Sequence, residues 1–190
     1  MPEPKYSQDA FTGLEAAIVL IAFVVVAAVF SYVVLGAGFY TSQKSQETVY
    51  KSVEQATSNI LMVGNIYGLA SVSPSAIDTV QFAIALTPGA PAADLTKMTV
   101  IYSSDAVSPI TYYYGGATTD ASHFSAVKSG TTTAAPALEQ TEQVTLVITL
   151  DTAAALKRNT RYNLEIRPVK GAAYTFTRTS GPNVDKTNVL

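Results

Sequence analysis

Few side chains in this sequence could carry out catalytic or metal chemistry. The chain of 190 residues contains one histidine and no cysteine, which excludes disulfides, zinc–thiolate sites, iron–sulfur clusters and thiol catalysis. The histidine, His123, falls in a Ser/Thr-rich stretch and, as the sole histidine, is too isolated for a metal site or a catalytic triad. The acidic residues form no recognisable acid–base pair, and there is no phosphate-binding glycine loop or nucleophile elbow. We therefore expect no enzymatic activity, no cofactor and no metal.

One carboxylate does require an explanation. Glu15 directly precedes residues 16–40, AAIVLIAFVVVAAVFSYVVLGAGFY, which contain no charged side chain. A carboxylate beside an apolar membrane segment is costly unless it has a partner. One interpretation is that Glu15 lies at the level of the lipid headgroups, where the macrodipole of a helix favours a negative charge near its N-terminus.

The uncharged segment 16–40 is long enough to be a membrane helix. A secretory signal would instead have an apolar core of about 7–15 residues followed by a small-residue cleavage motif, and no such motif precedes Gly36. We therefore expect the segment to remain in the mature protein. Residues 1–10, MPEPKYSQDA, carry two prolines and mixed charges and are typical of a detachable leader.

The charge content limits the possible partners. Charged residues make up 14 % of the chain, against roughly 25 % in soluble globular domains, while the apolar share of 48 % is ordinary. The formal net charge of −2 provides no basic field that could hold a polyanion. Nucleic acid is therefore not expected as a partner.

Beyond Tyr40 the pattern becomes amphipathic. Apolar residues follow one another at alternating spacings of four and three, as in a helix-packing seam: Val49, Val53, Ala56, Ile60 and Val63. This spacing predicts one long helix over residues 11–66, with Gly64 and Gly68 as candidate stops. At 1.5 Å per residue such a helix would be roughly 80 Å long, more than a bilayer requires. The seam indicates packing between helices rather than a cofactor groove.

Residues 67–190 show a different period. After Pro74, apolar residues alternate with others, as in Val80–Leu86, and short segments of this kind recur between turn signals such as Pro88-Gly89 and Lys170-Gly171. Further strands are expected at 98–102, 110–114, 143–150, 161–168 and 172–178. One residue or more of the run Tyr112–Tyr114 should point into the core, and the Thr-rich stretch 117–136 is expected to form an exposed loop. The prediction is an α+β protein whose head is an antiparallel, immunoglobulin-like β-sandwich or barrel.

The junction after the leader resembles the cleavage region of type IV pilins. In that family an aromatic residue follows the cut and a glutamate is the fifth residue of the mature chain, which Phe11 and Glu15 match for a cut after Ala10. Unlike most family members, this chain has alanine in place of glycine before the cut. Its leader also lacks a net positive charge.

Two further stretches, 88–105 and 164–182, are similar to archaellins in particular, so that the resemblance covers most of the chain. It implies a subunit of the archaellum, a motility filament at the archaeal cell surface that assembles from copies of one chain through the N-terminal helix. It also implies a membrane-inserted precursor, a prepilin-peptidase-like processing enzyme and a membrane assembly machinery. Glu15 would then pair with the new N-terminal ammonium group of Phe11 on a neighbouring subunit.

In such a filament core, small side chains permit close approach of the helices. The candidates in the apolar segment are Ala22, Ala27, Ala28 and Gly36. Asparagine-linked sugar is not expected, since no asparagine begins an Asn-x-Ser/Thr sequence.

Three other interpretations account for part of the pattern. An adhesive or DNA-uptake pilin would share the N-terminus but carry a head specialised for contact. A single-span membrane protein with a β-sandwich binding module would retain its leader and never polymerise, which leaves the seam unexplained. A membrane-anchored secreted enzyme would need catalytic groups that the sequence does not show.

Overall fold

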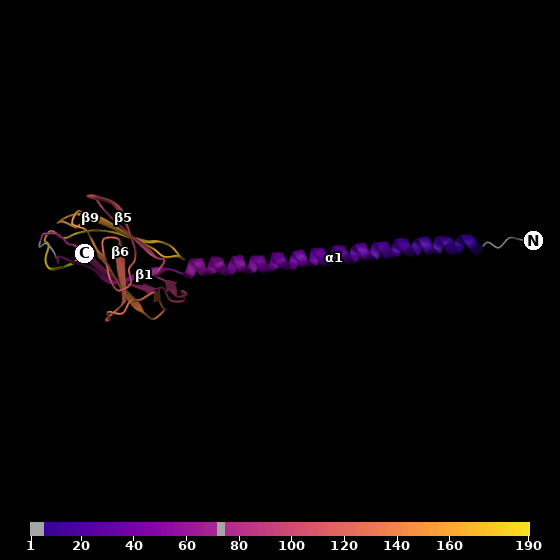
Figure 1. Ribbon diagram of the computed structural model, residues 1–190, viewed down its shortest axis with the longest axis horizontal. Helices are drawn as coiled ribbons and strands as arrows, with labels where there is room; N and C mark the ends of the chain where they lie inside the picture. Colours follow the sequence, from indigo (N-terminus) through magenta and orange to yellow (C-terminus); the bar gives the residue numbers. More distant parts are fainter. Residues whose placement is uncertain (1–5, 72–74) are drawn as a thin grey trace, which may run out of the picture. The chain divides into compact units, whose positions relative to one another are not determined.

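The computed structural model of the protein describes residues 6–71 and 75–190, with side chains described from Gly13 onward. The predicted leader therefore lies partly outside the described residues, as do the side chains of Ala10 and Phe11. The described residues form one helix, α1 (Tyr6–Thr57), followed by the strands of a head (Figure 1). It divides into two compact units, Met1–Tyr50 and Lys51–Leu190.

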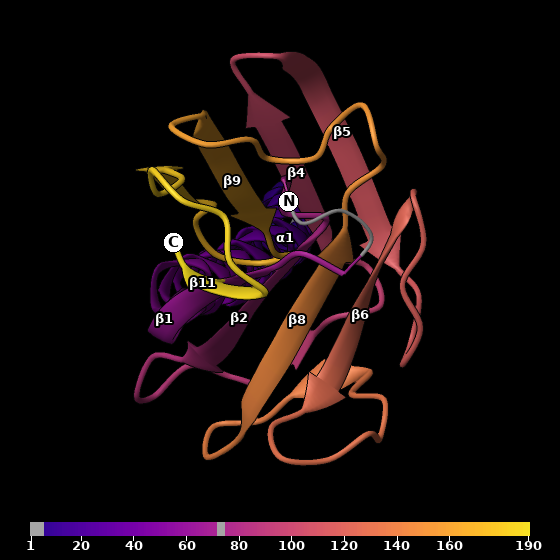
Figure 2. The same ribbon diagram turned by 90° about the vertical axis from the view of Figure 1, so that its left-hand side faces the viewer.

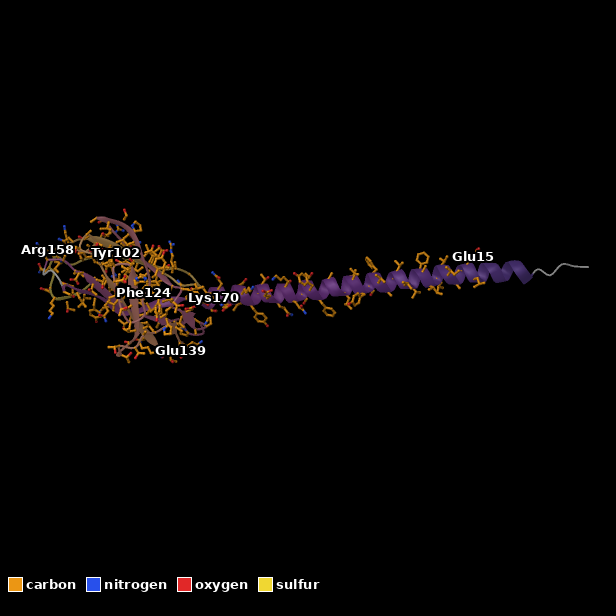
Figure 3. All side chains as sticks on the ribbon, viewed as in Figure 1. Glu15, Tyr102, Phe124, Glu139, Arg158 and Lys170 are labelled. Carbon is orange, nitrogen blue, oxygen red and sulfur yellow. The ribbon has the colours of Figure 1, made fainter. Side chains whose placement is uncertain are left out.

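The helix α1 has a continuous apolar surface. No proline interrupts Tyr6–Thr57, and leucine, alanine and isoleucine are compatible with the helical backbone. Every described residue from Gly13 to Gln46 is exposed, including the aromatic side chains of Phe23 and Tyr32. Figure 3 shows the side chains of α1, Glu15 among them, projecting outward from the helix. The segment Gly13–Thr57 is long and apolar enough to cross a membrane. None of the described side chains of the unit Met1–Tyr50 covers this surface.

The helix ends at Thr57, so the prediction that it continues to residue 66 is wrong. Ile60 and Val63 lie on strand β1 (Ile60–Leu69), paired with Leu86 and Ala83. Only Val49, Val53 and Ala56 of the predicted seam are helical.

Side chains of residues beyond Thr57 cap the end of the helix. Thr87 donates a hydrogen bond from its hydroxyl to the carbonyl of Thr57 at 3.2 Å, and the Asn59 amide donates to the carbonyl of Ala56 at 3.0 Å. These contacts satisfy carbonyl groups that a helix end leaves unpaired. Gly64, with φ 77°, lies where the register between β1 and β2 shifts, and so marks a β-bulge and not a helix stop.

The remaining strands are β2 (Thr79–Leu86), β3 (Ala93–Asp94), β4 (Thr99–Ser104), β5 (Val107–Tyr114), β6 (His123–Lys128), β7 (Ala137–Leu138), β8 (Gln143–Thr149), β9 (Arg161–Arg167), β10 (Tyr174–Thr179) and β11 (Thr187–Val189). Nine of the described strands form one hydrogen-bonded order, β10-β9-β4-β5-β6-β8-β2-β1-β11, and β3 pairs with β7. The order consists of two antiparallel halves joined by a short parallel pairing of β5 with β6. Figure 2 shows β9, β4 and β5 in one half and β6, β8, β2 and β1 in the other.

The two halves pack face to face around one apolar core. Phe82 on β2 contacts Phe176 on β10, with ring centroids 6.0 Å apart, although these strands lie far apart in the sheet order. Tyr102 on β4 donates from its hydroxyl to the carbonyl of Ala154 at 3.0 Å. Alternate residues of β2 are buried, as the period of two predicts. The predicted architecture, a long helix followed by a β-sandwich head, is confirmed.

One predicted loop contains a core strand. Within residues 117–136, β6 carries the buried side chains of Phe124, Ser125 and Ala126, because β6 pairs with β8. The Ser/Thr-rich composition of residues 117–136 led to the prediction of a loop, which is wrong for β6. Tyr112 is fully buried and Tyr113 is 56 % exposed, which confirms that the tyrosine run contributes to the core.

Candidate assembly surface

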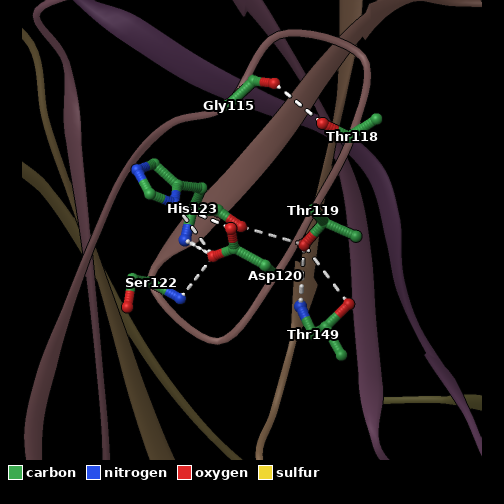
Figure 4. A network of polar contacts seen from close by, with 7 residues as sticks. All are labelled: Gly115, Thr118, Thr119, Asp120, Ser122, His123 and Thr149. Atoms are coloured by element: carbon green, nitrogen blue, oxygen red, sulfur yellow. Dashed lines mark hydrogen bonds and ion pairs between the residues drawn. The ribbon is translucent and has the colours of Figure 1, made fainter.

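The polar cluster around His123 stabilises a turn. The Asp120 carboxylate accepts hydrogen bonds from the backbone N–H groups of Ser122 and His123 and lies 2.9 Å from His123 Nδ1 (Figure 4). The Thr119 hydroxyl connects this turn to Thr149 on β8. The hydrogen bond from the Ser122 backbone, followed by that from His123, lowers the pKa of Asp120. Among the described residues no group of three His, Cys, Asp or Glu could hold a metal ion.

The largest candidate surface is α1 itself. Glu15 and the predicted small residues Ala22, Ala27, Ala28 and Gly36 are all exposed. At about 100° per residue, Ala22 and Gly36 lie on nearly the same side of the helix, while Ala27 and Ala28 lie on other sides. A Cβ atom on Gly36 would meet nothing within 4 Å. Small side chains are therefore distributed around α1 and do not form one stripe, which suits a helix with neighbours on several sides.

By contrast, Val49, Val53 and Ala56 lie within about 60° of one another around the helix axis. They form a narrow stripe in the last turns of α1, where Val49 and Val53 are 60 % and 55 % exposed. The structure thus keeps three members of the predicted seam together on α1 and moves Ile60 and Val63 into the sheet.

A hollow on the surface of α1 was missed by the sequence reasoning. It is lined by Phe30, Ser31, Val34, Leu35, Gly38, Phe39 and Ser42. One of these residues, Gly38, lacks a side chain. The signal that could have found it is the spacing of four between Val34, Gly38 and Ser42, which places all three on one side of the helix.

The last turn of α1 is tied to the head by contacts that sequence reasoning also missed. Lys170 Nζ lies 2.5 Å from Glu54 Oε1, and the Ala172 backbone N–H donates to the Asn59 side chain at 3.3 Å. Gly171 has φ 94°, and a Cβ atom there would lie 1.5 Å from the carbonyl oxygen of Ser58. Only glycine allows this approach. The Lys170-Gly171 pair, predicted only as a turn, therefore holds the helix end in place.

Comparisons with known proteins agree with this arrangement. The sequence model of the family described as archaeal-type flagellin matches residues 10–178. "Probable flagellin 1" of Archaeoglobus fulgidus is 38 % identical over 197 aligned positions, covering 97 % of this chain and 96 % of that protein. A "24 kDa flagellin" sequence of Methanospirillum hungatei is 84 % identical over 32 residues, which are 17 % of this chain and 100 % of that sequence.

A solved structure of the archaeal flagellum of Methanospirillum hungatei is similar with a TM-score of 0.76 and 36 % identity, covering 94 % of this chain and 99 % of that chain. The match extends through both the helix and the head, since it leaves little of either chain uncovered. The chain therefore belongs to the archaeal-type flagellin family and is a structural subunit of the archaeal flagellum, the archaellum.

Proposed function

We propose that α1 first anchors the unassembled subunit in the membrane and then packs against α1 of other copies to form the core of the filament. The observation that carries this proposal is the uncovered apolar surface of Gly13–Gln46. Burial of apolar surface contributes about 25 cal/mol per Å², so such a surface is unstable in water and stable in lipid. The head would remain outside the membrane, at the cell surface after assembly.

Transfer from lipid to a helix bundle depends on close packing. Lipid tails are as apolar as the side chains of α1, so association in the membrane requires van der Waals contact that small residues permit. The distribution of Ala22, Ala27, Ala28 and Gly36 around the helix suits contact with several neighbours. One heterologous contact repeated without closure produces an open helical filament, so a single kind of subunit can form the shaft.

Processing would prepare the N-terminus of this core. The proposed cut between Ala10 and Phe11, made by a prepilin-peptidase-like enzyme, falls within the continuous helix α1. The cut would leave the ammonium group of Phe11 at the N-terminus of the helix. The exposed Glu15 lies about one turn further along the same helix. We expect this ammonium group to pair with Glu15 of a neighbouring copy while the membrane assembly machinery adds the subunit.

Glu15→Gln tests the pairing. The substitution removes the charge and keeps the size, so membrane insertion should stay at the wild-type level while filament yield falls at least tenfold. Carbonate extraction measures insertion, and electron microscopy of cell-surface filaments measures yield. A normal yield would contradict the pairing. It would favour the other interpretation, in which the helix macrodipole stabilises Glu15 near the N-terminus.

The whole proposal is tested by isolating sheared cell-surface filaments, imaging them and sequencing the N-terminus of their main protein band. The expected N-terminal sequence is FTGLEAA. An intact chain that begins with Met1, found as a monomer in the membrane of cells without filaments, would contradict both processing and assembly. We expect no catalytic activity in either form.

A further inference from the structure

The head has a small apolar hollow beside the end of α1. It has a volume of about 270 Å³, and its walls are formed mainly by Ile60, Leu86, Pro91, Ala93, Pro168 and Val169. Ser58, the first residue after α1, also lines it. We call this feature the root hollow, because it lies in the head where the last turn of the helix joins β1. Val169, which lines it, is 54 % exposed.

The chemistry of the root hollow favours an apolar side chain over a small polar ligand. Its charged edge is already neutralised, since Lys170 pairs with Glu54 and Lys97 lies 3.4 Å from Asp94. Small-molecule sites are usually larger, about 300–1,000 Å³, and contain convergent polar groups. A hollow of this size with proline, alanine and valine walls suits one large side chain inserted as an anchor.

We infer that the root hollow receives α1 of a second copy of the chain, with Tyr50 as the inserted side chain. This inference rests on the proposed assembly through α1. Tyr50 is 75 % exposed and lies beside Val49 and Val53, which are also exposed. These residues belong to the last turns of α1, and Ser58, which directly follows α1 in the chain, lines the hollow. Since identical subunits repeat at one step, every root hollow and every Tyr50 recurs along the polymer at that same step.

The two surfaces are compatible in polarity. A tyrosine ring is apolar, while its hydroxyl needs a hydrogen-bond partner once buried. The ammonium groups of Lys97 and Lys170 at the edge of the hollow can donate to that hydroxyl. On the helix, Lys44 pairs with Glu47 at 2.7 Å, so these two charges before Tyr50 neutralise each other.

Thiol protection tests whether the hollow is covered in the filament. The chain has no native cysteine, so Val169→Cys introduces a unique thiol. Its alkylation should be at least tenfold slower in intact filaments than in detergent-dissociated subunits, relative to Thr132→Cys, an exposed head position away from the hollow. Equal relative rates in filaments and subunits would overturn the inference and leave assembly through α1 untouched. If Val169→Cys prevents filament formation, Lys97→Cys at the edge of the hollow replaces it in the same measurement.

Cross-linking tests the occupant. In filaments of the double variant Tyr50→Cys/Val169→Cys, a short bis-maleimide reagent should produce a ladder of dimers and higher oligomers on a denaturing gel. The two single variants are the controls, and each should remain monomeric. Monomers alone in the double variant would overturn the inference, even if Val169→Cys is protected, because protection would then come from another surface. Absence of filaments from wild-type cells would instead contradict the proposed function itself.

Discussion

The helix and the head of this subunit obtain their stability in different ways. In the head, aromatic and aliphatic side chains such as Phe82, Tyr102 and Leu146 are almost completely buried within one chain. On α1, side chains of the same types remain exposed from Gly13 to Gln46. We therefore expect the head to fold as a unit of its own, and we expect α1 to need lipid or other helices around it. A substitution in the head should alter folding, and one in α1 should alter assembly.

The largest expected effect that separates the two regions is alkaline unfolding of the head. Burial raises the pKa of Tyr102 and of Tyr112 to about 12, and it also raises that of Tyr162. Because the folded state holds these protons more tightly, its advantage is complete below pH 10, the ordinary value for tyrosine, and falls as the pH rises toward 12. In detergent, near-ultraviolet circular dichroism of the head should disappear over this range while the helical signal of α1 persists.

Tyr112→Phe is the matched variant for this titration. The Tyr112 hydroxyl is buried and has no hydrogen-bond partner among the described residues, so its removal should cost little at pH 7. The variant should unfold at a higher pH than the wild type. Simultaneous loss of the α1 signal and the head signal would contradict the separation of the two regions.

A core truncation should have the next largest effect. Phe82 is 1 % exposed, and Phe82→Ala should lower the free energy of unfolding of the head by about 3–5 kcal/mol, because it leaves a cavity. Urea unfolding in detergent measures the change. The control is Phe23→Ala in α1, where the side chain is 71 % exposed. It should leave head unfolding unchanged and reduce filament yield, so a shift in the unfolding midpoint of the head would count against the comparison.

A smaller effect is expected at the last turn of the helix. Gly171→Ala should destabilise the head by about 2 kcal/mol or more, since alanine is disfavoured at φ 94° and its Cβ would overlap the Ser58 carbonyl oxygen. Gly36→Ala on α1 provides the contrast, because nothing lies within 4 Å of the added Cβ. Thermal unfolding of both variants measures the difference. Equal melting temperatures would show that the loop at Gly171 moves away without a penalty.

The smallest effect is expected at the turn beside β6. Asp120→Asn removes a carboxylate whose pKa is lowered by backbone hydrogen bonds. The stabilisation that this charge provides is present above the ordinary pKa of aspartate, about 3.9, and is lost as the pH falls through the lowered value. The wild type should therefore be slightly more stable than the variant at pH 7 and equally stable near pH 2. A constant difference in urea midpoint at both pH values would assign the effect to shape and not to charge.

Local patterns were sufficient for most elements. The absence of charge from 16–40 predicted the apolar part of α1, because an uncharged apolar run of this length is typical of a membrane helix. Alternation predicted Val80–Leu86 correctly, since a strand with one buried face must repeat every two residues. The same is true of Gln143–Leu150 and Arg161–Pro168, which contain β8 and β9. The cleavage bond at Ala10 and the pairing of Glu15 remain predictions.

Local patterns failed where distant parts of the chain compete for the same residues. The spacing of Val49, Val53, Ala56, Ile60 and Val63 fits a helix throughout, and no local signal separates its first three members from its last two. Ile60 and Val63 become part of a strand because β2 and the C-terminal strand β11 pair with β1 on its two sides. Strand β6, within a polar stretch, exists because β8 and β5 lie on either side of it.

The amino-acid order alone thus specifies a long apolar helix, a β-rich head and the candidate processing site, since each depends on residues that are neighbours in the chain. The end of the helix, the close approach at Gly171 and the root hollow depend on contacts between segments that are tens to more than one hundred residues apart. Such contacts are selected by the total burial and hydrogen bonding of the folded head, which no short window of sequence contains.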